Sequence, residues 1–261
     1  MVTRDTPWPD GTPSWVDLGS NDIPKAIAFY SRQFGWEIEP GGPEMGGYTM
    51  ARLGGRNVAG IGPIMGPPGT PSAWTTYFAS SDVDATATRI ASAGGQILSA
   101  PMDVMEQGRL VVAADVAGAV FGVWQGRKHT GTEVANVPGA FTWSEHMSRD
   151  FEADKAFYAA VFGYEYGDMS SDGFSYATML INGQQVVGGM GAFPASQGDD
   201  QPAQWSVYFG TADTDKAVAA AIGNGGRVIR PAADSPYGRM AVVADADGAV
   251  FSLISTPADD E

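Results

Sequence analysis

The sequence predicts an α+β protein made of two similar domains, because one unit occurs twice along its 261 residues. The repeated segments are AFYSRQFGWE (28–37) and AFYAAVFGYE (156–165), SSDVDATATRIASAGGQIL (80–98) and TADTDKAVAAAIGNGGRVI (211–229), and QGRLVVAADVAGAVFGVW (107–124) and YGRMAVVADADGAVFSLI (237–254). Their first residues differ by 128 (156−28), 131 (211−80) and 130 (237−107). Such constant offsets indicate a duplication, and each copy contains both helical and extended patterns.

Each copy begins with a strand followed by an amphipathic helix. In the first copy the strand is expected over 13–20 and the helix over 23–35, where apolar residues recur at helical spacing. Asn21 or Asp22 is the expected N-cap, and Gly35 is expected to end the helix in a left-handed conformation. The corresponding strand and helix of the second copy fall at 141–148 and 151–163, and strands at 48–54 and 57–64 complete the first unit.

The second half of each copy repeats this order. Strands are expected over 73–80 and 204–211, each followed by a helix whose N-cap is Asp82 or Asp213. In the first copy, further strands are expected over 96–103, 108–115 and 119–125. Each copy therefore consists of two strand–helix–strand–strand–strand units. We expect a first domain over 12–126, a linker over 127–139 and a second domain over 140–256.

Composition limits the classes of function. The chain has no cysteine, which excludes disulfides and thiolate chemistry. A formal net charge of −15 disfavours nucleic acid and anionic membranes as partners. No apolar run is long enough to span a bilayer, and the N-terminal residues show no signal-peptide pattern, so the cytoplasm is the expected location.

The order of these motifs resembles the vicinal oxygen chelate (VOC) family. The resemblance rests on AFYxxxFG followed by W/Y-E, on D-x-D, on GGx(I/V) and on DxxGAVF, and it covers about residues 13–125 and 141–255. The family includes glyoxalase I, extradiol dioxygenases, fosfomycin-resistance enzymes and bleomycin-sequestering proteins. The chain is most similar to the two-domain glyoxalase-like bacterial members. This resemblance implies that two units form a curved eight-stranded sheet, a cup that holds a ligand.

The family usually binds a divalent metal through His, Glu or Gln in the cup. Alignment with the resemblance puts these ligand positions on Trp15 and Trp143, near Gly60 and Gly188, on Thr75 and Ser206, and on Gly122 and Ser252. None of these residues is a usual metal ligand, so we expect no metal and no other cofactor. Of the two histidines, His129 falls in the linker. His146 is expected on the side of its strand opposite Trp143, as a surface or interface residue.

Strand alternation predicts what lines each cup. The first cup consists of Trp15, Asp17, Thr75, Tyr77, Gly122 and Trp124. The second cup consists of Trp143, Glu145, Ser206, Tyr208, Ser252 and Ile254. Except for Gly122 and Ile254, these are the candidate ligand-binding residues. Asp17 and Glu145 are also the candidate acid–base groups, because burial raises a carboxyl pKa. In the alternative interpretation the tryptophans only fill the core, and the two carboxylates lie outside the cup or pair with Arg109 or Arg239.

Three functions remain open. We expect first a metal-independent binding protein for a hydrophobic or aromatic natural product or antibiotic-like molecule, since Trp and Tyr favour flat or cationic ligands. The alternatives are a metal-free enzyme acting on a natural product or reactive carbonyl, and a glyoxalase or dioxygenase-type enzyme with a rearranged metal site. The partner is a small molecule, and both a monomer and a homodimer fit the pattern. The second cup, with more hydroxyls, is the first place to look.

Overall fold

The computed structural model describes residues 2–42, 45–171, 173–194 and 201–255. In this part of the chain, two eight-stranded mixed sheets carry four helices, and a two-stranded sheet joins β1 (Val2–Thr3) to β10 (Val134–Ala135). The α+β class and the two tandem domains are therefore confirmed. No helix in the described part of the chain is both long and apolar enough to cross a membrane.

The first sheet has the strand order β3-β4-β5-β2-β6-β9-β8-β7. Its strands are β2 (Pro13–Ser20), β3 (Glu37–Glu39), β4 (Thr49–Leu53), β5 (Arg56–Pro63), β6 (Ala73–Ala79), β7 (Gln96–Val104), β8 (Gly108–Ala114) and β9 (Val120–Gly126). Its helices are α1 (Ile23–Phe34) and α2 (Val83–Ser92). The central pair β2 and β6 is antiparallel, and each of these strands also pairs in parallel with the last strand of its own unit.

The second sheet repeats this order as β12-β13-β14-β11-β15-β18-β17-β16. Its strands are β11 (Phe141–Ser148), β12 (Glu165–Asp168), β13 (Tyr176–Ile181), β14 (Gln184–Ala192), β15 (Gln204–Gly210), β16 (Arg227–Ser235), β17 (Gly238–Ala244) and β18 (Val250–Ser255). Its helices are α3 (Phe151–Phe162) and α4 (Thr214–Gly223). Residue 256, the last of the predicted second domain, lies outside the described residues.

The helix ends follow the predicted capping pattern. The carboxylate of Asp22, not Asn21, accepts the backbone N–H of Lys25 at the start of α1. Asp82 and Asp213 cap α2 and α4 in the same way. Gly35 ends α1 with φ 71°, a conformation that a residue without a Cβ adopts at little cost.

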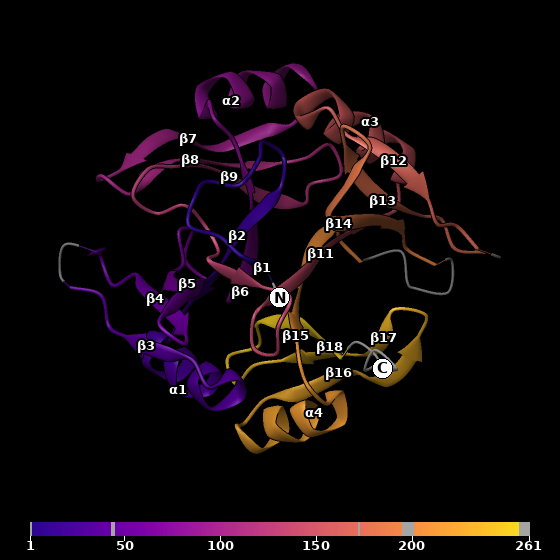
Figure 1. Cartoon of the computed structure of the whole chain (residues 1–261). Coiled ribbons are helices and arrows are strands. Elements are labelled where there is room, and N and C mark those ends of the chain that lie inside the picture. Colours follow the sequence, from indigo (N-terminus) through magenta and orange to yellow (C-terminus); the bar gives the residue numbers. More distant parts are fainter. Residues whose placement is uncertain (1, 43–44, 172, 195–200, 256–261) are drawn as a thin grey trace.

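The helix-bearing faces of the two sheets pack against each other, so the main cores lie between the domains. In Figure 1, α1 lies beside α4 at one end of the molecule and α2 beside α3 at the other. One apolar cluster combines the first unit of the first domain with the last unit of the second domain, and the other combines the two middle units. Phe29 and Phe251, for example, meet edge to face across this interface. The opposite faces of the two sheets remain free to form separate sites.

Candidate functional site

The strand register places the predicted lining of the first cup on one face of its sheet. Trp15 lies opposite Tyr77, and Asp17 opposite Thr75. Tyr77 pairs in turn with Gly122 on β9, and Trp124 lies two residues further along that strand. Residues two apart in a strand share a face, so all six predicted residues face the same side.

The second cup shows the same arrangement. Trp143 lies opposite Tyr208, Glu145 opposite Ser206, and Tyr208 beside Ser252. Tyr208 and Ser252 are buried, whereas Trp143 and Glu145 are only partly buried. Neither Asp17 nor Glu145 has slipped to the outer face.

A hydrogen-bonded network surrounds the carboxyl group of the first cup. Tyr48 donates its hydroxyl proton to Asp17 (3.3 Å between oxygens), and the indole N–H of Trp15 donates to the Tyr48 hydroxyl (3.0 Å). Tyr77 is a second hydroxyl donor to Asp17. Burial nevertheless raises the pKa of Asp17 to about 7, because the two hydroxyl donors offset only part of the cost of burying its charge.

The second cup contains a matching network. Tyr208 donates to Glu145 (2.8 Å), Tyr176 is its second donor, and the indole N–H of Trp143 donates to the Tyr176 hydroxyl (3.2 Å). Burial raises the pKa of Glu145, and the charge of Arg230 opposes this shift. Each cup therefore offers an indole ring and a carboxyl group held by two tyrosines.

Sequence reasoning did not find Tyr48 and Tyr176. The two differ by 128 (176−48), the offset of the surrounding repeat, so comparison of the copies could have identified them. Tyr48 immediately precedes β4 and Tyr176 begins β13, strands that carry none of the ligand positions implied by the resemblance.

The two predicted arginines do not enter the cups. Arg109 pairs with Asp84 (2.9 Å), and Arg239 pairs with Asp215 (2.7 Å), an acidic residue at the start of the neighbouring helix in each case. The alternative in which they neutralise Asp17 or Glu145 is therefore wrong. Each arginine instead joins neighbouring segments, since Arg109 also contacts Asp103 and Arg239 also contacts Asp234.

The linker closes over the first cup. The imidazole of His129 lies against Trp15, with ring centroids 4.3 Å apart and planes at 79°, and 5.4 Å from the ring of Trp124. Trp15 retains only 3% of its exposure. The second cup keeps Trp143 partly exposed, so the two cups differ in access.

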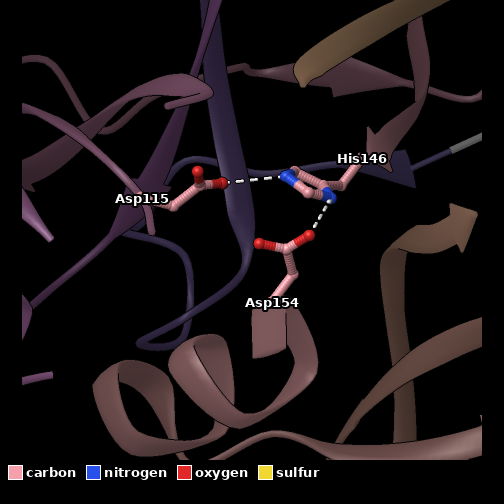
Figure 2. A group of neighbouring side chains, drawn as sticks. All are labelled: Asp115, His146 and Asp154. Carbon is pink, nitrogen blue, oxygen red and sulfur yellow. Dashed lines mark hydrogen bonds and ion pairs between the residues drawn. The ribbon is translucent and has the colours of Figure 1, made fainter. Parts of the chain in front are cut away.

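His146 occupies a different place, between the domains. Its Nε2 lies 2.8 Å from a carboxylate oxygen of Asp115, and its Nδ1 lies 3.9 Å from Asp154 (Figure 2). Tyr158 also donates to Asp115 (2.8 Å), and Ser148 donates to Asp154. His146 is thus an interface residue, fully buried and not on the surface.

Among the described residues, this cluster is the one group of three side chains with metal-ligand spacing. The two carboxylates face different ring nitrogens, that of Asp115 at hydrogen-bonding distance (2.8 Å) and that of Asp154 at 3.9 Å (Figure 2). Asp115 already accepts the backbone N–H groups of Ala117 and Ala119 as well. These contacts describe a hydrogen-bond network, and the cluster lies on the opposite side of the sheet from the second cup.

The family comparisons agree with the repeat. Residues 12–123 match the Glyoxalase/Bleomycin resistance protein/Dioxygenase superfamily, and residues 145–254 match a glyoxalase-like domain. The chain belongs to this superfamily. The two matches place one VOC domain in each half of the chain.

Full-length relatives carry two kinds of name. The chain is 38% identical over 251 residues to "Putative glyoxylase CFP32" of Mycobacterium tuberculosis (strain CDC 1551 / Oshkosh), with 94% of each chain covered. It is 36% identical over 272 residues to "Anthracycline biosynthesis protein DnrV" of Streptomyces peucetius, which covers 97% of this chain and 95% of the relative.

Solved VOC structures share the fold. The Mn(II)-bound glyoxalase of Novosphingobium aromaticivorans aligns with a TM-score of 0.65 at 14% identity, over 95% of this chain and 83% of that chain. The 2,2',3-trihydroxybiphenyl 1,2-dioxygenase of Sphingomonas wittichii strain RW1 aligns at 0.64 and 13% identity, over 95% and 91%. At such identities the likeness concerns the fold alone.

The cup residues do not fit the metal that the superfamily implies. Asp17 is the register partner of Gly60, and the hydroxyl of Tyr48 fills the space that a side chain at Gly60 would need. In the second cup the equivalent glycine is Gly189, one residue beyond the expected position, and the Tyr176 hydroxyl fills its space. Among the described residues, each cup therefore presents one carboxyl group engaged by tyrosines, a poor donor set for a divalent cation.

Proposed function

We propose that this VOC protein binds an uncharged, flat aromatic molecule in the second cup without a metal. The observation that carries the proposal is the duplicated network, in which a tryptophan, two tyrosines and one carboxyl group occupy the region where the superfamily places metal ligands. In the second cup this network includes the partly exposed Trp143. An apolar surface with a few fixed polar groups is the usual form of a small-molecule site.

The chemistry of the second cup favours an aromatic ligand with oxygen substituents. The indole of Trp143 offers a ring for stacking, and its N–H is fixed by Tyr176. Glu145, whose pKa is raised by burial, provides hydrogen-bonding oxygens beside this ring. The rings of such a ligand would stack on Trp143, and a hydroxyl or carbonyl group at its edge would hydrogen-bond to Glu145 and Tyr208.

The names of the relatives support the same ligand class. Two Streptomyces relatives are named anthracycline biosynthesis proteins, and each aligns with at least 97% of this chain. An anthracycline contains fused planar rings with quinone and hydroxyl oxygens. Such a molecule would place a stacking surface on Trp143 and a polar edge beside Glu145.

The test uses 1,4-dihydroxyanthraquinone, an uncharged probe with such rings, titrated into protein treated with EDTA. We expect saturable quenching of tryptophan fluorescence, and a Kd about 5- to 150-fold weaker in Trp143→Ala, since ring stacking contributes about 1–3 kcal/mol. Trp15→Ala, in the cup covered by His129, is the matched control, and it should leave the Kd of the second cup unchanged. Equal Kd values for the wild type and Trp143→Ala would contradict the proposal.

A second candidate function is metal-free acid–base catalysis. It is favoured by the carboxyl group of Asp17, whose pKa of about 7 suits proton transfer at neutral pH, and by the relatives named as glyoxylases. This function requires turnover that survives chelation and is lost in Asp17→Asn or Glu145→Gln. Turnover that disappears with EDTA and returns with Mn²⁺ would exclude it.

A further inference from the structure

One side chain of the linker fills the first cup from outside the sheet. The imidazole of His129 lies edge to face on Trp15 and beside Trp124, and these rings form a small cluster with Tyr77 apart from the two main cores. The position that an aromatic ligand would take in the second cup, next to Trp143, is thus taken in the first cup by an aromatic ring of the chain itself.

Burying the imidazole of His129 in this space is energetically unfavourable. Both of its ring nitrogens are buried, and neither has a hydrogen-bond partner in the described part of the chain. Burial lowers the pKa of His129 to about 4, so the ring is neutral at pH 7. A buried polar group without a hydrogen-bond partner costs folding free energy that an apolar side chain would not cost. Stability alone therefore does not explain why a histidine occupies this position.

The contacts that hold the ring in place are local. The main-chain oxygen of His129 accepts the indole N–H of Trp124 (2.9 Å), and its N–H donates to Gln107 (3.1 Å). On the solvent side, Lys128 pairs with Glu106 through exposed groups. Gly131, with φ 105°, follows the segment and permits a turn that other residues rarely adopt.

In the described part of the chain, no ring covers Trp143 as His129 covers Trp15. The chain contains two histidines, and the other one, His146, lies buried on the opposite face of its sheet. Trp143 remains partly exposed, whereas its counterpart Trp15 is covered. Withdrawal of His129 would leave the first cup with the same exposed indole and carboxyl network as the second.

We propose that the first cup is a second binding site for an uncharged flat aromatic ring, and that His129 is a built-in plug which this ligand displaces. The inference rests on the proposed function of the second cup, since it assigns the same ligand class to the first. In the first cup the ligand competes with the imidazole of His129, because binding must move that ring into solvent.

The experiment uses the Trp143→Ala variant, which isolates the first cup, with 1,4-dihydroxyanthraquinone as the probe. The ring signals of the two histidines are followed by NMR over a pH titration. We expect the saturating probe to raise the pKa of His129 from about 4 to about 6.5, the value of a solvated imidazole. Removal of the plug in His129→Gly/Trp143→Ala is expected to lower the Kd of the probe at least about tenfold relative to Trp143→Ala.

Two outcomes would overturn the inference. One is an unchanged His129 titration at a probe concentration that saturates the double variant. The other is a double variant that binds the probe no more tightly than Trp143→Ala. The proposed function has a different failure, in which Trp143→Ala binds the probe as tightly as the wild type. The His129 signals can still be measured in that case, so the two failures are distinguishable. Thermal unfolding of each variant shows whether it is folded.

Discussion

The buried cluster around His146 has a natural control in the other half of the molecule. Asp245 occupies the place of Asp115 and accepts the Tyr30 hydroxyl (3.0 Å), as Asp115 accepts Tyr158. The positions equivalent to His146 and Asp154, 128 residues earlier (146−18 and 154−26), are Leu18 and Ala26, both buried. The fold therefore tolerates an apolar pair where the second domain has an ionisable one.

This difference predicts the effect of replacing one or both partners. His146→Leu removes the bond to Asp115 and leaves Asp154 buried with Ser148 as its donor. We expect this single change to lower the free energy of unfolding by about 3–5 kcal/mol, the usual cost of breaking a buried pair. Asp154→Ala removes a carboxyl group with one unpartnered buried oxygen and leaves the His146–Asp115 bond intact, so we expect a loss of about 1 kcal/mol or less.

The double variant His146→Leu/Asp154→Ala copies Leu18 and Ala26. We expect its free energy of unfolding to lie within about 1 kcal/mol of the wild type, because Leu18 and Ala26 fill the equivalent places in the first domain while Asp245 keeps Tyr30, as Asp115 would keep Tyr158. Urea unfolding followed by circular dichroism measures all four corners of this cycle. A double variant no more stable than His146→Leu would refute the reasoning that the two halves are interchangeable here.

Three further predictions concern the cups. Burial raises the pKa of Asp17 to about 7 from 3.8, so the folded chain holds a proton between these pH values that the unfolded chain has lost. The contribution of this group to the free energy of unfolding therefore falls as the pH rises through that window, by at most about 4 kcal/mol. In Asp17→Asn, the free energy of unfolding in urea should depend less steeply on pH between pH 4.5 and 7.5. Parallel pH dependences in the two proteins would contradict this. Gly60→Ala should cost about 1–3 kcal/mol in the same assay, because its methyl group overlaps the Tyr48 hydroxyl, and an unchanged midpoint would mean that Tyr48 moves freely. EDTA, followed by added Mn²⁺, should leave both the melting temperature and the probe Kd unchanged, whereas a rise in melting temperature with Mn²⁺ would reveal a metal site.

Local patterns in the sequence were sufficient for the architecture. The Asp caps, the glycine helix ends and the alternation of Trp15 with Asp17 depend on near neighbours, and the structure has them where the pattern predicts. The duplication predicted two similar domains, since the same offsets recur along the chain. These features depend on short segments of sequence, so they can be predicted without knowing which distant residues are in contact.

The missing parts of the site depend on long-range contacts. Tyr48 reaches Asp17 across 31 residues of chain, and His129 reaches Trp15 across 114 (129−15). No periodicity marks a linker residue as the filling of a cup. Likewise, nothing in the strand pattern around His146 indicates the carboxylate of Asp115 from the other domain.

The central claim is that the second cup binds a flat aromatic molecule without a metal. The most direct measurement is the Kd of 1,4-dihydroxyanthraquinone for EDTA-treated wild-type protein, Trp143→Ala and Trp15→Ala, by fluorescence titration. The account predicts saturable binding whose tighter Kd weakens at least about fivefold in Trp143→Ala and is kept in Trp15→Ala, where the second cup is intact. Binding that appears only after Mn²⁺ is added, or that is the same in all three proteins, would contradict it.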